Sequence, residues 1–293
     1  MSDQQCRFLF DNADIRGEFV QLEQSYQQVI SNNDLPTVIQ QLLGDFLSAV
    51  SLLAATLKFD GILTLQARGS GPLSMIMAEC THQQQVRAIA RLNEEVDETT
   101  PLPNDLQALV GNDGILALII DPDKGERYQG IVPLDAPNLA ACLEHYFSQS
   151  EQIGTRIWLA RNQQRCAGLL LQALPKSNVA TEEENLDHWQ TAVHLVSTVK
   201  AEELLELAPQ TLVHRLLNEF PIRLLAATPV AFQCSCSRER SAQALSALGE
   251  TEVMTMLAES PTIIIDCQFC HQRYQFDMDD LSELFPDNHP TLH

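Results

Sequence analysis

The chain has 293 residues, of which 45% are hydrophobic, and its 18 basic and 39 acidic residues give a formal net charge of -21. This length and apolar content suffice for one large or two modest domains, each with a proper core. The negative field repels polyanions, so we expect no nucleic-acid partner. We find no positive segment followed by an apolar one at the start, and no stretch that approaches the ~20 apolar residues of a membrane helix. We therefore expect a cytoplasmic protein that binds no membrane.

In the first part of the chain, the spacing of apolar residues predicts a short strand followed by helices. The strand is expected at residues 7–10, and an amphipathic helix should follow because apolar side chains recur at helical spacing from Phe19 to Ile30. Residues 37–57 carry apolar or small side chains almost all round a helix, which is typical of a buried helix.

From residue 59 onward the apolar residues alternate, which indicates β-strands. Gly69-Ser-Gly-Pro72 separates the first two strands as a tight turn. The expected strands are residues 62–68, 73–80, 86–92, 115–120, 128–134, 157–160 and 168–174, with a helix at 138–150. This order predicts an α+β domain over residues 1–175, in which helices pack on a largely antiparallel sheet.

Residues 176–231 predict a helical linker. Thr181-Glu-Glu-Glu184 has the form of a capping box at the start of a helix, and two shorter apolar helices should follow before Pro221. Isolated helices shorter than ~12–15 residues are marginal in water, so these helices must pack against another part of the chain.

Four of the eight cysteines form two close pairs, Cys234-Ser-Cys236 and Cys267-Gln-Phe-Cys270. Zinc holds thiolate sulfurs at ~2.3 Å in a tetrahedron, so two ligands from one segment must bring their sulfurs within roughly 4 Å. Cys-x-Cys in an extended backbone directs both side chains to one side, and the second pair is typical of the turn of a β-hairpin. The two pairs together predict a structural zinc site with one ion.

Other interpretations of these cysteines stay open. The pairs could be unlinked thiols, or two disulfides in an exported protein, although a reducing cytoplasm favours metal binding. His271 could replace one sulfur as a ligand. Arg238, Arg240 and Arg273 lie near the thiolates in sequence, where they either offset negative charge or are simply solvated. The scattered Cys80 and Cys142 are predicted to be buried apolar side chains, and neither they nor Cys6 and Cys166 are assigned a redox role.

Residues 232–293 are expected to form a small zinc-binding domain. Ser237 should begin a helix that ends at Gly249, strands are expected at 263–265 and 274–276, and a short helix at 277–285. Such a module has little core, so a metal would supply much of its stability, ~10–16 kcal/mol in small zinc peptides.

Oxidation of the four sulfurs would remove this contribution. Exposing five or six apolar linker side chains costs a comparable amount, at roughly 1.5–3 kcal/mol each. A redox switch is therefore energetically feasible, and a constitutive zinc module without a switch is the alternative.

Sequence motifs along nearly the whole chain resemble one known family. The cysteine segments are Cys234-Ser-Cys-Ser-Arg-Glu-Arg240 and Cys267-Gln-Phe-Cys270, and the N-terminal segments are Leu57-Lys-Phe-Asp-Gly61, Gln66-Ala-Arg-Gly-Ser-Gly-Pro72, Arg127-Tyr-Gln-Gly-Ile-Val132, Glu144-His-Tyr-Phe-Ser-Gln-Ser-Glu151 and Gly168-Leu-Leu-Leu-Gln-Ala-Leu-Pro175. They resemble those of the 33-kDa heat-shock proteins, bacterial redox-regulated holdase chaperones. Ser241 stands where relatives can carry a further cysteine, at a position that is not a zinc ligand.

The resemblance implies a mechanism that composition and spacing do not show. Zinc would be held by Cys234, Cys236, Cys267 and Cys270 in a reduced form that is inactive as a chaperone. Hypochlorite, or peroxide with heat, would convert these residues into the disulfides Cys234–Cys236 and Cys267–Cys270. The linker would then unfold, and the protein would form a homodimer that holds unfolding client proteins without ATP. The protein would not be an enzyme.

The apolar faces of the linker are our candidates for client binding, with packing against the N-terminal domain as their resting role. They contain Leu186, Trp189, Val193, Val196, Leu212, Leu216, Leu217 and Phe220.

Two other functions could use the same cysteines. A thiol oxidoreductase would use Cys267 and Cys270, but it needs that pair at a helix N-terminus after a strand. The acidic net charge argues against a nucleic-acid-binding zinc ribbon, and so does the presence of only two basic residues between Ser237 and Ser260.

Overall fold

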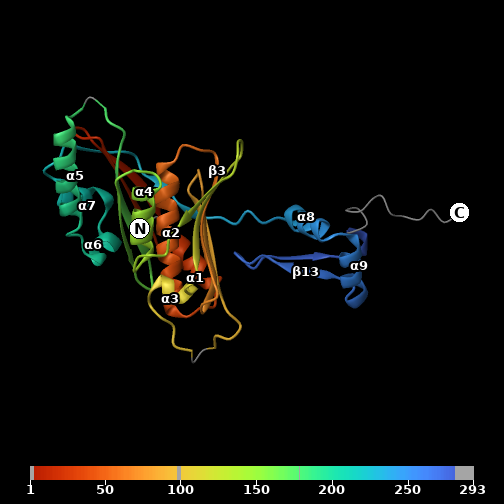
Figure 1. The fold of residues 1–293 in the computed structure, drawn as a ribbon. Coiled ribbons are helices and arrows are strands. Elements are labelled where there is room, and N and C mark those ends of the chain that lie inside the picture. Colours follow the sequence, from red (N-terminus) through yellow and green to blue (C-terminus); the bar gives the residue numbers. More distant parts are fainter. Residues whose placement is uncertain (1–2, 98–99, 178, 281–293) are drawn as a thin grey trace. The chain divides into compact units, whose positions relative to one another are not determined.

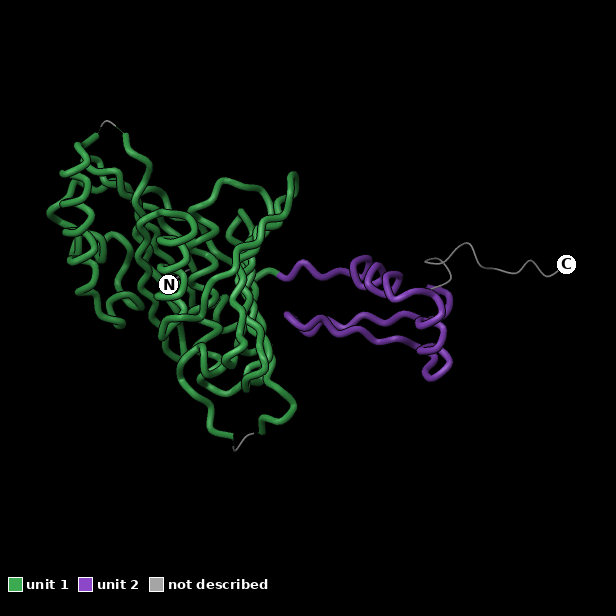
Figure 2. The backbone as a smooth tube through the Cα atoms, viewed as in Figure 1, with its two compact units in different colours: residues 1–233 green, residues 234–293 purple. Residues whose placement is uncertain are grey.

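The computed structural model describes residues 3–97, 100–177 and 179–280. The chain divides into two compact units, residues 1–233 and 234–293 (Figure 2). The N-terminal domain and the linker region thus lie in one unit, and the two cysteine pairs lie in the other. The combination of antiparallel sheets and helices confirms the predicted α+β class.

In the first unit, the described residues form two six-stranded sheets. The strands of sheet A are β1 (Gln4–Phe10), β2 (Ile15–Leu22), β8 (Thr155–Arg161), β9 (Cys166–Ala173), β10 (Ile222–Leu224) and β11 (Thr228–Pro229). Their order is β10-β1-β2-β9-β8, with β11 also paired to β1. The strands of sheet B are β3 (Gly61–Arg68), β4 (Leu73–Thr81), β5 (Gln85–Leu92), β6 (Ile115–Pro122), β7 (Tyr128–Val132) and β12 (Ala231–Phe232). Their order is β12-β5-β4-β3-β6-β7.

The helix α2 (Thr37–Thr56) is the centre of the first unit and contacts strands of both sheets (Figure 1). Its buried side chains share one apolar cluster with residues of both sheets, which confirms the predicted buried helix. The other helices of this part are α1 (Gln24–Ser31), α3 (Leu106–Val110) and α4 (Leu139–Gln149). The scattered cysteines Cys6, Cys80, Cys142 and Cys166 are buried, as expected for Cys80 and Cys142.

The expectation that no stretch resembles a membrane helix is wrong for α2. This helix has 20 residues and a mean hydropathy of 1.5, which suffice by length and composition to cross a membrane. However, 78% of its apolar window is buried inside the protein, as in the core helix of a soluble fold. Burial between two sheets explains the apolar composition.

The helix expected from Phe19 to Ile30 is wrong in its first half. Residues 15–22 form the central strand β2, which pairs with β1 and β9, and only the later residues form α1. A Cβ atom at Gly17 would lie 1.9 Å from the Phe8 ring, so this ring of the paired strand β1 lies directly over the glycine. Apolar residues on both faces of a buried strand can imitate helical spacing, because every position is then free to be apolar.

The linker helices are α5 (Glu182–Val196), α6 (Ala201–Glu206) and α7 (Pro209–Leu217) (Figure 1). The capping box of Thr181 and Glu184 begins α5 as predicted. The helices cover the face of sheet A opposite α2, and their apolar residues share a cluster with Phe8, Phe10 and Phe19. Sheet A is therefore buried on both faces.

Side-chain hydrogen bonds also attach the linker to sheet A. The Asp14 carboxylate accepts bonds from the Ser177 backbone N–H, at 3.0 Å, and from the Asn185 amide, at 2.8 Å. The Gln21 amide donates to the carbonyl oxygens of Leu204 and Leu207, both at 2.9 Å. The bonds from Gln21 satisfy carbonyl groups at the end of α6, and all four bonds attach the linker to sheet A.

After the linker helices the chain pairs with both sheets. The short strands β10 and β11 are antiparallel to β1, and β12 is parallel to β5. They were not expected, because segments of two or three residues carry no readable periodicity.

The second unit contains α8 (Arg238–Leu248), α9 (Glu250–Glu259) and the hairpin of β13 (Ile263–Asp266) and β14 (Arg273–Phe276). Ser237 caps α8 and Gly249, with φ of 92°, follows its end, both as predicted. The helix α9 was not expected. The short helix expected at 277–285 is helical at residues 278–280, and its remainder lies outside the described residues. The core of this unit has five buried apolar side chains among the described residues, which is small for an independent fold.

Candidate metal centre

The second cysteine pair lies in the turn between β13 and β14, which confirms the predicted hairpin. The Cys267 backbone N–H donates to the Gln272 carbonyl at 2.9 Å, and the His271 N–H donates to the Cys267 carbonyl at 2.7 Å. His271 has a φ of 55°, in the left-handed region that closes a tight turn. The backbone of the hairpin thus holds Cys267 and Cys270 in place. A thiol oxidoreductase would need this pair at the N-terminus of a helix, and the turn does not provide one.

The first cysteine pair lies on the segment between β12 and α8, and side chains hold this segment in place. Arg240 donates to the Ser235 carbonyl oxygen at 2.9 Å and to the Ser235 hydroxyl at 2.7 Å. Ser237 accepts the Arg240 backbone N–H at 3.2 Å as the cap of the helix. The residue between Cys234 and Cys236 is therefore fixed by the first turn of α8.

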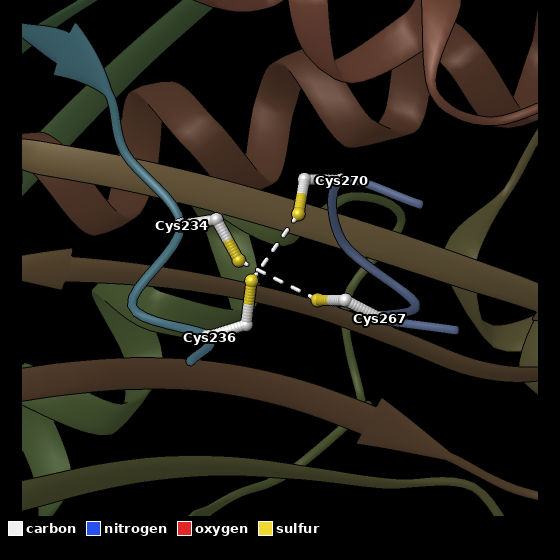
Figure 3. Close-up of side chains that lie close together, drawn as sticks. All are labelled: Cys234, Cys236, Cys267 and Cys270. Carbon is white, nitrogen blue, oxygen red and sulfur yellow. Dashed lines mark hydrogen bonds between the residues drawn. The ribbon is translucent and has the colours of Figure 1, made fainter. Parts of the chain in front are cut away.

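The four sulfur atoms converge on one point (Figure 3). All lie within 4.8 Å of one another, with 3.5 Å between Cys234 and Cys267 and 3.4 Å between Cys236 and Cys270. A tetrahedron with metal–sulfur bonds of ~2.3 Å has edges of roughly 3.8 Å, so the sulfurs fit around one ion. The cluster could hold a metal ion, and a set of four thiolates suits zinc.

The surroundings of the Cys270 sulfur disfavour a free thiolate. Burial, foremost, together with the neighbouring sulfurs, raises the pKa of the Cys270 thiol. A bound cation acts in the opposite direction, because it stabilises the deprotonated sulfur. A bound ion would therefore keep the Cys270 sulfur deprotonated against the effect of its surroundings.

The arginines near the cluster bind oxygen atoms. Arg238 pairs with Asp280 at 2.6 Å, and its guanidinium lies 4.5 Å from the centre of the Phe276 ring. Arg273 pairs with Asp266 at 2.8 Å across the hairpin. These contacts assign the arginines to bracing the backbone around the cluster.

One contact of the cluster was not predicted from the sequence. The Tyr274 hydroxyl donates a hydrogen bond to the Cys236 sulfur at 3.2 Å, and this bond raises the pKa of Tyr274 to about 12. The alternation of Tyr274 with Phe276 predicted a strand face but gave no sign of a partner 38 residues away. His271, considered as a ligand, is not part of the cluster found among the described residues.

The candidate client-binding residues belong to the first unit. Leu186 is 57% exposed, whereas four others are buried against sheet A: Val196, Leu212, Leu216 and Leu217. The remaining three are partly buried in the same cluster: Trp189, Val193 and Phe220. In this structure most of them pack against the sheet.

The fold and the site define a class: a two-unit α+β protein with a four-cysteine centre in its small C-terminal unit. The family model described as "Hsp33 protein" matches residues 3–277. A 33 kDa chaperonin of Ectopseudomonas mendocina is 48% identical over 286 residues, covering 97% of this chain and 96% of the relative. A 33 kDa chaperonin of Pseudomonas aeruginosa is 49% identical over 285 residues, covering 97% of this chain and 95% of the relative.

A crystal structure of the 33 kDa chaperonin of Thermotoga maritima has the same fold, with a TM-score of 0.78 at 21% identity, covering 97% of this chain and 98% of that one. The chain belongs to the Hsp33 family. It is a heat-shock chaperone and not an enzyme, and its C-terminal cysteine cluster is consistent with a zinc and redox centre.

Proposed function

We propose that the protein is a redox-regulated, ATP-independent holdase, inactive when reduced and active when oxidised. The observation that carries this proposal is the convergence of four sulfurs, from two segments far apart in sequence, in a unit with a very small core. Such a unit depends on its cross-link for stability, so a change in the state of the sulfurs changes the fold.

In the proposed reduced form, one Zn²⁺ is held by Cys234, Cys236, Cys267 and Cys270. When bound, the ion supplies a cross-link and no catalysis, because four protein ligands leave no open position. The hairpin turn and the first turn of α8 present the sulfurs to one another, so the chain loses little further entropy on binding.

The proposed oxidation forms two disulfides, Cys234–Cys236 and Cys267–Cys270. For each, two thiolates lose two electrons to an oxidant, and one sulfur–sulfur bond forms. With hypochlorous acid the oxygen–chlorine bond breaks, and chloride and hydroxide leave. Disulfide sulfurs no longer serve as thiolate ligands, so the cross-link between the two segments is lost. The local pairing rests on the resemblance to the family, and the mutual distance of at most 4.8 Å is compatible with it.

The proposed response is release of the linker from sheet A. Release would expose the apolar faces of α5–α7 and also the sheet residues beneath them, such as Phe8, Phe10 and Phe19, which are at most 5% exposed. Each such side chain carries roughly 1.5–3 kcal/mol of apolar contact energy, which an unfolding client can satisfy in place of the linker. Both surfaces are therefore candidates for client binding.

The proposed setting is the cytoplasm of a bacterium, where thiols stay reduced until oxidants accumulate. The oxidised protein would act as a homodimer. Both points follow the family resemblance, and the kinship with 33 kDa chaperonins of bacteria supports them.

The deciding experiment is a light-scattering assay with a thermally unfolding client, run with the same preparation reduced and oxidised. We expect suppression of aggregation after oxidation and little before it, with return to the inactive form when thiols and zinc are restored. Equal suppression by the reduced protein would remove the switch from the proposal. Zinc and thiol titrations run in parallel should find about one ion and four reactive thiols per reduced chain. Both should be lost together on oxidation.

A further inference from the structure

The side chain of Tyr274 connects the two segments that supply the sulfurs. It lies in β14 opposite Ile265 of β13, and its ring packs against the core of the second unit. Its hydroxyl reaches the Cys236 sulfur at 3.2 Å. The hairpin that carries Cys267 and Cys270 therefore also holds a cysteine of the other pair.

Packing alone does not require this hydroxyl. Phe276 lies two residues further along the same strand, on the same face, and fills the core at 2% exposure with a ring that has no hydroxyl. A phenylalanine at position 274 would keep the ring and lose only the donor. The polar contact is thus separable from the fold of the unit.

A hydrogen bond to a thiolate has two chemical effects. It fixes the rotamer of the side chain, as partners of metal ligands commonly do. It also draws electron density from the sulfur, which makes the sulfur a weaker nucleophile and a weaker electron donor. A metal-bound thiolate carries no proton, so the phenol must be the donor.

We propose that Tyr274 is a positioning residue of the cysteine centre: its hydroxyl orients the Cys236 sulfur and lowers its reactivity toward electrophiles. The inference rests on the proposed function, because it concerns sulfurs that hold a metal as thiolates. It assigns to Cys236 a protection that comes from a side chain of the hairpin.

The test uses the full chain loaded with Co²⁺, whose thiolate-to-metal charge-transfer band reports the electron density on sulfur. In Tyr274→Phe we expect one cobalt per chain, as in the wild type, and a band shifted to lower energy. Alkylation by iodoacetamide, which forms a carbon–sulfur bond and releases iodide, should accelerate about threefold to tenfold at Cys236 and stay unchanged at Cys267 when read by mass spectrometry. Tyr128→Phe is the matched control, because it removes a hydroxyl bonded to Tyr146 and Glu151 in the first unit.

A second measurement changes the donor strength of the phenol in the wild-type chain itself. The chain has four tyrosines, and replacing them with 3-fluorotyrosine makes each phenol a stronger donor. The band should then shift to higher energy in the wild type and stay unchanged in Tyr274→Phe.

Two results would overturn the inference on Tyr274 and leave the proposed metal centre intact. One is a bound cobalt whose charge-transfer band shifts neither in Tyr274→Phe nor with 3-fluorotyrosine. The other is an equal acceleration of alkylation at all four cysteines. A wild-type chain that binds no cobalt or zinc would refute the proposed metal centre, and this inference with it.

Discussion

The two faces of sheet A are both buried, but their covers differ. One face packs on α2, a 20-residue helix that also contacts sheet B. The other packs on linker helices of 15, 6 and 9 residues, whose apolar side chains share a cluster with sheet A. Burial alone therefore does not distinguish a permanent core from the cover that we propose is released. The contacts of each cover distinguish the two, because α2 cannot leave without exposing the apolar side chains of both sheets.

The largest expected effect follows removal of the metal from the reduced protein with a chelator. The second unit should lose the ~10–16 kcal/mol that a structural zinc supplies and unfold. Hydrogen exchange should then show unprotected backbone amides in α8 and β13–β14, reduced protection in the linker helices and full protection in α2. Simultaneous loss of protection in α2 would show that the two faces of sheet A are not independent.

Truncating one buried leucine in each cover compares the two faces directly. Leu212→Ala in α7 and Leu47→Ala in α2 remove the same atoms from sites with 0% exposure, at a cost of about 2–5 kcal/mol each. We expect Leu212→Ala to increase the hydrogen exchange of the backbone amides in the linker helices. It should also make the reduced protein partly active in the light-scattering assay. Leu47→Ala should lower the free energy of global unfolding in urea and leave the reduced protein inactive.

The reverse result, an active reduced Leu47→Ala and an inactive reduced Leu212→Ala, would locate the releasable cover at α2.

The smallest expected effect is the pH dependence of the free energy of unfolding, and it concerns the face of sheet A that packs on α2. Glu18 is fully buried in β2, and its burial raises its pKa to about 7, although Arg7 at 2.6 Å acts in the opposite direction. In the unfolded chain its pKa is near 4.5. Between these values the folded protein holds a proton that the unfolded chain releases, so the free energy of unfolding should fall as pH rises from about 4.5 to 7, by up to ~3 kcal/mol.

Urea titrations at several pH values measure this effect. Glu18→Gln should remove that part of the pH dependence, because an amide does not titrate. Glu79→Gln, which removes a carboxylate paired with Arg87 on sheet B, should keep it. An unchanged pH profile in Glu18→Gln would assign the dependence to other groups.

Sequence patterns predicted the features that depend on local spacing. The separations between Cys234 and Cys236, and between Cys267 and Cys270, bring the sulfurs of each pair together within a few residues of chain, so the metal centre could be anticipated. The same holds for α2, whose apolar periodicity covers 20 residues. The capping residues Thr181 and Ser237 were found for the same reason.

Features that depend on distant partners were not predicted. Residues 15–22 have a spacing that fits a helix, and only pairing with β1 and β9 makes them a strand. The strands β10–β12 exist because β1 and β5 offer free edges. The bond from Tyr274 to Cys236 crosses 38 residues and likewise leaves no local pattern.

The pairing of β10–β12 gives the chain an order of detachment. Cys234 follows Phe232 of β12 by one intervening residue, and β12 has two residues paired to the edge of sheet B. Going back along the chain, the next attachments are β11, then β10, and then the helix α7. A chain that detaches from its Cys234 end would lose these pairings one after another, and each consists of only two or three residue pairs. In the proposed switch, no single step of the release would therefore have to break more than one of these short pairings.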